Sequence, residues 1–220
     1  MKKQLISALT IIISLYSACK SGKSDQAKLP ILGNREPVTK TVNGQTVTDT
    51  VYSTIPDFKF VNQYADTITG KSLAGKIYVA DFFFTTCPSI CPIMHRNMLN
   101  VYNEFKADDN FRILSHSIDP KYDTVPVLKK YADKMGISGN TWWLLHGSKE
   151  DIYQIAKNYL VSVMDKNPQG EFIHDGYFIL VDKQKRLRGT YDGTDPAQVT
   201  KLIADIKTLK AEPDEANAAK

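Results

Sequence analysis

The chain passes without interruption from an apolar run into a cysteine segment: Ile77-Tyr78-Val79-Ala80-Asp81-Phe82-Phe83-Phe84, then Thr85-Thr86-Cys87-Pro88-Ser89-Ile90-Cys91-Pro92. The run is almost continuously apolar and β-prone, which is typical of a strand buried on both faces of a sheet. Apolar residues then recur at helical spacing at Ile90, Met94, Met98, Val101 and Phe105. The pattern therefore predicts a strand over 77–84, a helix over 90–105, and both cysteines at their junction.

Outward from this junction, strand and helix patterns alternate. Strands are predicted at 58–61, 111–118 and 142–145, and helices at 124–135 and 149–159. A hairpin with strands at 177–182 and 187–192 follows, and the last helix covers 196–209. This order is expected of a thioredoxin-like α/β sandwich, with a central mixed sheet flanked by helices. We assign residues 55–210 to this one domain.

Shorter segments flank the predicted domain. Residues 20–54 are interpreted as a tether, in which Asn43-Gly44 stands between short β-prone pieces and predicts an N-terminal β-hairpin. Residues 211–220 are small and charged, and we expect them to form a flexible tail.

Composition places the chain among ordinary globular proteins. It has 220 residues, of which 42% are hydrophobic and 24% charged, and only 3 are cysteines, which excludes disordered and disulfide-dense classes. The formal net charge is +4, and basic residues are scattered among acidic ones without interleaved aromatics. A surface that follows a phosphate backbone is therefore not expected, and nucleic acid is excluded as a partner.

The N-terminus has the pattern of an export signal. Lys2 and Lys3 precede an apolar run that ends before Cys19, which is too short for a membrane span and typical of a signal peptide over residues 1–19. Ser17-Ala18-Cys19 resembles the lipobox of bacterial lipoproteins, although Tyr16 stands where that pattern usually has leucine. We expect lipidation at Cys19, with a cleaved signal peptide and an incidental cysteine as the alternative. The protein is then exported and held by its lipid at a membrane facing the bacterial periplasm, an oxidising compartment.

Cys87 and Cys91 are four residues apart, about one helical turn. This spacing allows a disulfide, and it equally allows two thiolates to bind one soft ion such as Cu(I). Unpaired N–H groups at a helix N-terminus favour the thiolate form that either chemistry needs. A purely structural disulfide is a weaker interpretation, because a bridge across one turn constrains the unfolded chain little.

A third ligand should be an imidazole if Cu(II) is also to be bound, and four histidines compete for this role. His95 is one turn beyond Cys91 but would strain a small site, so we expect it to pack or cap a surface. His116 lies inside a predicted buried strand, and His146 closes another. His174 precedes the 177–182 strand after a polar loop, and loops on a rigid sheet are where binding residues concentrate. It is the best candidate.

Three ordered segments resemble the signatures of the Sco/SenC proteins: the 82–92 stretch, Ser117-Ile118-Asp119-Pro120 with Asp123-Thr124, and His174 ahead of the 177–182 strand. The resemblance covers about residues 55–210. It implies a thioredoxin-like fold that binds one copper ion through Cys87, Cys91 and His174. It also implies a metallochaperone that assists assembly of the dinuclear copper centre of cytochrome c oxidase.

Two residues need separate mention within this resemblance. Asp119 matches an acidic position near the family's site, so a supporting role beside the ligands is expected, with a simple turn residue as the alternative. Thr86 stands where many members have a histidine or another polar group. The implied partners are a copper-accepting oxidase subunit and an upstream copper donor or thiol reductant.

The alternative function is enzymatic. Cys87 and Cys91 are then the catalytic redox pair of a thiol-disulfide oxidoreductase that reduces the cysteines of the oxidase subunit or of another exported protein. Thioredoxin-type catalysts, however, have a two-residue spacer and a proline before the strand that faces the cysteines, whereas here the segment is Phe172-Ile173-His174-Asp175-Gly176. An imidazole there favours metal binding over disulfide exchange. A peroxide-consuming thiol enzyme is a third, less supported possibility.

Overall fold

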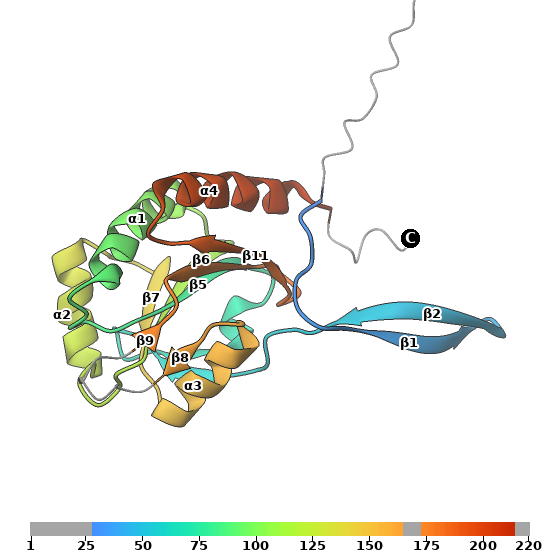
Figure 1. Ribbon diagram of the computed structural model, residues 1–220, viewed down its shortest axis with the longest axis horizontal. Helices are drawn as coiled ribbons and strands as arrows, with labels where there is room; N and C mark the ends of the chain where they lie inside the picture. Colours follow the sequence, from blue (N-terminus) through green and yellow to red (C-terminus); the bar gives the residue numbers. More distant parts are fainter. Residues whose placement is uncertain (1–27, 165–172, 214–220) are drawn as a thin grey trace, which may run out of the picture.

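The structure, a computed structural model, describes residues 28–164 and 173–213, and its central element is a mixed sheet (Figure 1). The strands of this sheet are β5 (Ile77–Phe83), β6 (Phe111–Ser117), β7 (Trp142–Leu145), β10 (Tyr177–Val181) and β11 (Leu187–Asp192). Their order is β11-β10-β5-β6-β7; β5, β6 and β7 are parallel, and β10 is antiparallel to both of its neighbours.

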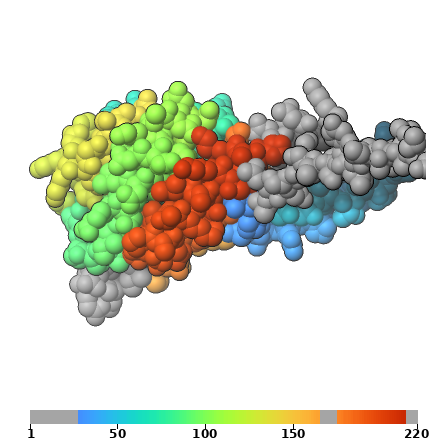
Figure 2. Space-filling model, turned by 90° about the horizontal axis from the view of Figure 1, so that it is seen from above, coloured from blue at the N-terminus to red at the C-terminus, as the bar shows by residue number. Residues whose placement is uncertain are grey.

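The described residues form four α-helices around this sheet: α1 (Ile90–Phe105), α2 (Val125–Met135), α3 (Lys149–Asn158) and α4 (Pro196–Ala211). Helices α1 and α4 lie side by side across one face (Figure 2), α3 covers the opposite face, and α2 lies beside β7. The α/β sandwich predicted from the alternation of patterns is confirmed.

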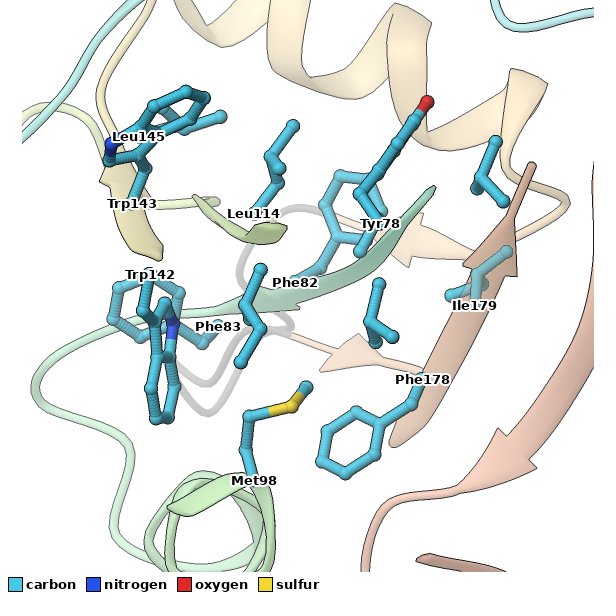
Figure 3. Close-up of a cluster of buried hydrophobic side chains, with 14 of the residues drawn as sticks. Tyr78, Phe82, Phe83, Met98, Leu114, Trp142, Trp143, Leu145, Phe178 and Ile179 are labelled. Atoms are coloured by element: carbon cyan, nitrogen blue, oxygen red, sulfur yellow. The ribbon is translucent and has the colours of Figure 1, made fainter. Parts of the chain in front are cut away.

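Strands β5 and β6 are buried along their whole length, as the apolar run predicted. In their parallel register Asp81 pairs with Ser115, and Phe82 pairs with His116. Because successive side chains of a strand point to opposite faces, the first pair faces α1 and the second faces α3. Figure 3 shows the same division, with Met98 and Phe178 on one side of the sheet and Tyr78 and Trp143 on the other.

The predicted N-terminal hairpin is also confirmed. Strands β1 (Arg35–Val42) and β2 (Gln45–Tyr52) pair antiparallel and project away from the sheet (Figure 1). The turn needs positive φ at both central residues, and Asn43 and Gly44 supply φ angles of 51° and 79°.

Several short elements were not predicted. They are β4 (Thr67–Thr69), a 3₁₀ helix over Gly70–Leu73, β8 (Val163–Met164) and β9 (Ile173–His174). The strand predicted at 58–61 is present as β3 (Lys59–Val61), and the other predicted boundaries either coincide with the structure or differ by at most two residues. No helix within the described ranges is both long and apolar enough to span a bilayer. The signal peptide, Cys19 and most of the predicted tail lie outside the described residues.

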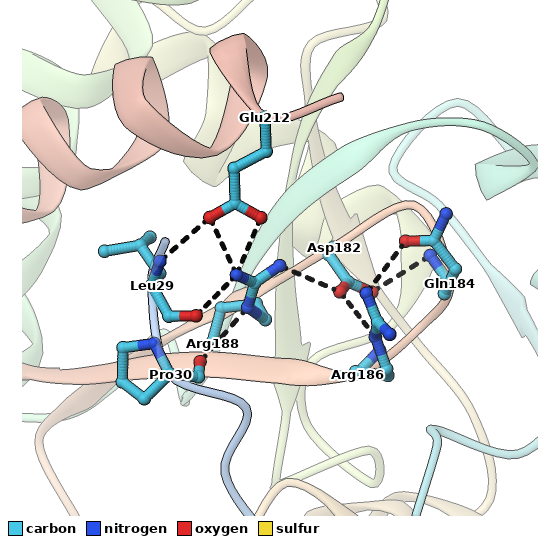
Figure 4. A network of polar contacts seen from close by, with 7 residues as sticks. All are labelled: Leu29, Pro30, Asp182, Gln184, Arg186, Arg188 and Glu212. Atoms are coloured by element: carbon cyan, nitrogen blue, oxygen red, sulfur yellow. Dashed lines mark hydrogen bonds and ion pairs between the residues drawn. The ribbon is translucent and has the colours of Figure 1, made fainter. Parts of the chain in front are cut away.

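A buried arginine, Arg188, contacts the first described residues of the chain (Figure 4). The Arg188 guanidinium donates to the carbonyl oxygens of Leu29 and Pro30, at 2.6 and 3.1 Å, and to both oxygens of Glu212, each at 2.8 Å. It also contacts Asp182 Oδ2 at 3.2 Å, and its side chain is only 4% exposed. Arg188 therefore fastens the start of the described chain to β11 and to the end of α4.

Candidate metal centre

The two cysteines occupy the loop that follows β5 and the first turn of α1. Cys87 lies in the loop, where its N–H donates to the Phe84 carbonyl at 3.2 Å, and Cys91 lies within the first turn. The Cys91 N–H donates to the Cys87 sulfur at 3.5 Å, and the two sulfurs are not joined in a disulfide. The predicted junction is therefore confirmed, and the helix presents a backbone donor to the first sulfur.

The electrostatics of the second thiol differ from the prediction. A hydrogen bond with Cys87 and, next, burial raise the pKa of the Cys91 thiol above its usual range. The expectation that the helix N-terminus favours a thiolate is therefore wrong for Cys91 in this reduced pair. The reason is that Cys91 is 1% exposed and hydrogen-bonded to Cys87, and both the burial and this neighbour disfavour its charged form. A metal ion must displace protons to bind here.

A buried carboxylate anchors the loop that carries Cys87. Asp123 accepts from the Thr85 N–H at 3.0 Å, from the Thr85 hydroxyl, and from the Ser117 hydroxyl at 2.6 Å. Burial raises the pKa of Asp123, although these hydrogen bonds act in the opposite direction. Asp123 thus joins the cysteine loop to the end of β6, a role that its place in the sequence did not indicate.

Behind the first turn of α1 lies a buried polar network. His95 is 2% exposed, and its ring nitrogens lie 3.3 Å from Asp81 Oδ2 and 3.0 Å from the Tyr131 hydroxyl. Asp81 also accepts from the Ser115 hydroxyl at 2.5 Å, and Ser115 in turn accepts from the Trp142 indole N–H at 2.8 Å. The prediction that His95 packs is confirmed, and its partners come from β5 and α2.

His174 is the residue on which the sequence prediction rests most. The structure places its backbone in β9, where it pairs with Val163 of β8, three residues before β10 begins. The prediction that it belongs to a loop is therefore wrong in detail, because its backbone is part of a short antiparallel ladder. The His174 side chain lies outside the description.

The remaining candidate residues have structural contacts. His116 is fully buried against Phe82, with ring centroids 5.0 Å apart, as its strand position predicted. His146 directly follows β7, and its Nδ1 lies 3.0 Å from the Asp123 carbonyl. Asp119 is in a turn: its carbonyl accepts from the Asp123 N–H at 2.9 Å and also from the Tyr122 N–H.

Among the described side chains, three or more His, Cys, Asp or Glu residues do not meet as a group that could hold a metal ion. The described part of the site consists of a soft sulfur pair, Cys87 and Cys91, at the start of α1. A mixed sheet with helices on both faces and a thiol pair where a central strand passes into a helix together define a thioredoxin-like protein.

Comparison with known proteins gives the family. The SCO1/SenC family model matches residues 47–211, and the chain belongs to this family. Over 169 residues it is 32% identical to the SCO1 protein homolog of Bacillus subtilis, covering 75% of this chain and 87% of the relative.

Solved structures agree with this assignment. A SCO1/SenC family lipoprotein from Bacillus anthracis is 33% identical and superposes with a TM-score of 0.66, over 71% of this chain and 95% of the other. BsSco, described as having a disulfide switch and as a member of the Sco family of cytochrome c oxidase assembly proteins, is 30% identical, with a TM-score of 0.64 and coverages of 73% and 95%. Arabidopsis thaliana ScoI with copper bound is 23% identical and shares the fold, with a TM-score of 0.59 and coverages of 69% and 97%.

Proposed function

We propose that this protein binds copper through Cys87, Cys91 and His174 and assists assembly of the dinuclear copper centre of cytochrome c oxidase. Two sulfurs and an imidazole are a donor set that suits both Cu(I) and Cu(II). Copper is the cargo in this proposal, received from an upstream donor and passed to a subunit of the oxidase. Its family relatives support it, because one is described as a cytochrome c oxidase assembly protein and another has been crystallised with copper.

The observation that carries the proposal is a contact between α1 and the segment after His174. A methyl group placed on Gly176 would lie 3.6 Å from Ile90 Cδ1 and 3.7 Å from the Met94 sulfur. Gly176 is two residues beyond His174, and Ile90 immediately precedes Cys91. The backbone beside His174 and the turn that carries the thiols therefore lie against the same end of α1.

The thiol pair also supports reversible binding. Loading requires both thiols to lose their protons, so copper binding should weaken as the pH falls. Two-electron oxidation of the pair by a disulfide partner forms a Cys87–Cys91 bond, reduces the partner to two thiols and removes both sulfur donors. Low coordination leaves a side open, so ligands of an acceptor can replace these donors one at a time.

The test is a copper titration of the reduced, purified protein. We expect one equivalent to bind, the disulfide-oxidised protein to bind none, and Cys87→Ser and His174→Ala to lower the affinity. His146→Asn is the matched control, because this histidine is outside the proposed ligand set and asparagine retains a side chain that can reach the Asp123 carbonyl. Binding that is unchanged in both Cys87→Ser and His174→Ala would rule out the site.

A thiol-disulfide oxidoreductase is the second candidate, favoured by the hydrogen bond between the two thiols within one helical turn. In that function Cys87 and Cys91 reduce the cysteines of an acceptor, and His174 is dispensable. Turnover of a protein disulfide at a catalytic ratio by the His174→Ala variant would favour this enzyme over a metallochaperone.

We also propose the cellular location and the chain organisation from the sequence. Residues 1–19 are a signal peptide, Cys19 carries the lipid, residues 20–54 are a tether that includes the hairpin, and residues 55–210 are the functional domain. A related Bacillus anthracis structure is described as a lipoprotein, which supports the lipid anchor. Cys19→Ser should move the protein from the membrane fraction to the soluble exported fraction, whereas Cys87→Ser should leave it at the membrane. Fractionation followed by intact-mass measurement tests this expectation.

A further inference from the structure

The short ladder that contains His174 continues one pair further than β8 and β9 themselves. Val163 pairs with His174 and Met164 pairs with Ile173, so the next pair in this register is Ser162 with Asp175. The Asp175 N–H donates to the Ser162 carbonyl at 3.2 Å, as such a ladder requires. The backbone on both sides of residues 165–172 is therefore joined at this third pair.

The second hydrogen bond of this pair, from Ser162 to Asp175, has a side-chain acceptor in place of the backbone carbonyl. The Ser162 N–H donates to Asp175 Oδ2 at 2.8 Å. A carboxylate acceptor makes a stronger hydrogen bond than a neutral carbonyl does. Asp175 thus contacts Ser162 with both its backbone and its side chain, immediately beside His174.

The following residue is fixed to α1. The Gly176 carbonyl accepts from the Gly193 N–H at 2.8 Å, and the Gly193 carbonyl accepts from the Asn97 side chain of α1 at 2.8 Å. Asn97 is buried, and it belongs to α1, the helix whose first turn contains Cys91. The segment after His174 is consequently held by Ser162 on one side and by α1, through Gly193, on the other.

We propose that Asp175 is a positioning residue for His174: its carboxylate closes the ladder to Ser162 and so holds the His174 backbone beside the thiol pair before copper arrives. This inference rests on the proposed function, in which His174 is a copper ligand. A ligand that is already in place binds without the cost of ordering its backbone. The two thiols are positioned by α1 and the β5 loop, so Asp175 affects the imidazole donor alone.

Asp175→Ala removes the acceptor of the Ser162 N–H and keeps the rest of the chain. One net hydrogen bond of this kind corresponds to about a fivefold change in affinity. We therefore expect Cu(II) to bind Asp175→Ala about fivefold more weakly than the wild type, with an altered absorption and electron paramagnetic resonance signature of the nitrogen ligand. Asp175→Asn retains an oxygen acceptor, although a neutral one, and should restore most of the affinity and the spectrum.

The test uses Cu(II) alone as the probe, with the purified full chain. Asp49→Ala is the matched control, because Asp49 also accepts a backbone N–H, that of Thr50 at 2.8 Å, but lies in the hairpin. In the absence of copper, amide hydrogen exchange at Ser162 and Val163 should become faster in Asp175→Ala and stay unchanged in Asp49→Ala. This second measurement reports the ladder independently of metal.

His174→Ala separates the two proposals. If His174→Ala weakens copper binding and Asp175→Ala adds no further loss in that variant, Asp175 acts through His174 as proposed. If His174→Ala weakens binding but Asp175→Ala alone has no effect, or if the two losses add, the positioning role is wrong and the ligand set stands. If His174→Ala leaves copper binding unchanged, the ligand set fails and the role of Asp175 fails with it.

Discussion

Replacing Arg188 with methionine should lower the free energy of unfolding by about 3 kcal/mol, the lower end of the range for breaking a buried ion pair. The guanidinium contacts Asp182 and Glu212 in a site where its own side chain is 4% exposed, so its loss leaves carboxylate groups without their buried cation. The cost stays at the lower end for two reasons. Asp182 keeps its 2.8 Å contact with Arg186, and Glu212 keeps the Leu29 N–H.

Urea unfolding of Arg188→Met measures this cost, and Lys129→Met is the control. The Lys129 ammonium contacts Asp133 at 2.6 Å on the exposed surface of α2, where an ion pair contributes about 0.5 kcal/mol or less. Because Arg188 also holds the Leu29 and Pro30 carbonyls, proteolysis near residue 30 should become faster in Arg188→Met and remain unchanged in the control. A loss of stability no larger than that of Lys129→Met would show that the buried arginine is not needed to hold these segments together.

The parts of the fold that could be predicted from the sequence are those determined by residues close together along the chain. A short, continuous apolar run of β-prone residues is typical of a strand buried inside a sheet, and an apolar helical stripe directly after it is expected to pack on that sheet, so the position of Cys87 and Cys91 could be predicted from the local pattern. The Asn43-Gly44 turn was predictable for a similar reason, because its backbone requirement is local.

Features that depend on distant partners could not be predicted. Arg188 bonds to Leu29, which is 159 residues away, and no local pattern indicates that pairing. Strands β8 and β9 have two residues each, too few to show an alternation, so His174 was interpreted as a loop residue. His95 was correctly expected to pack, but its partners Asp81 and Tyr131 come from other elements and became visible only in three dimensions.

A buried histidine lies on each face of the sheet, and the two histidines have different surroundings. On the α1 face, His95 lies between Asp81 and Tyr131, both of which offer polar atoms to its ring. On the α3 face, His116 stacks on Phe82 and meets Phe60 and Tyr159 edge-on or tilted, at ring centroid distances of 5.4 and 5.6 Å. Among the described residues, its Nε2 has no hydrogen-bond partner. A protonated ring is therefore unfavourable at His116.

Stability should consequently rise by about 3 kcal/mol between pH 4 and pH 7 because of His116 alone. Burial lowers the pKa of His116 from 6.5 to about 4, while the Asp81 charge and carbonyl act against this shift. Between these two values the unfolded chain binds a proton that the folded chain does not, so the free energy of unfolding falls as the pH is lowered through this window. As the pH rises past 6.5 the unfolded imidazole also loses its proton, and this contribution to the pH dependence fades.

Urea unfolding of the wild type and of His116→Phe from pH 4 to pH 7 isolates this effect. Phenylalanine keeps an aromatic ring against Phe82 and cannot titrate, so the difference between the two proteins should change by about 3 kcal/mol across the window. The difference between the two proteins is the quantity to compare, because Asp123 also titrates. Burial raises the pKa of Asp123, so its contribution to stability falls as the pH rises, and this contribution is the same in the wild type and in His116→Phe. Parallel curves for the wild type and His116→Phe would mean that His116 is protonated in the folded protein as readily as in the unfolded chain.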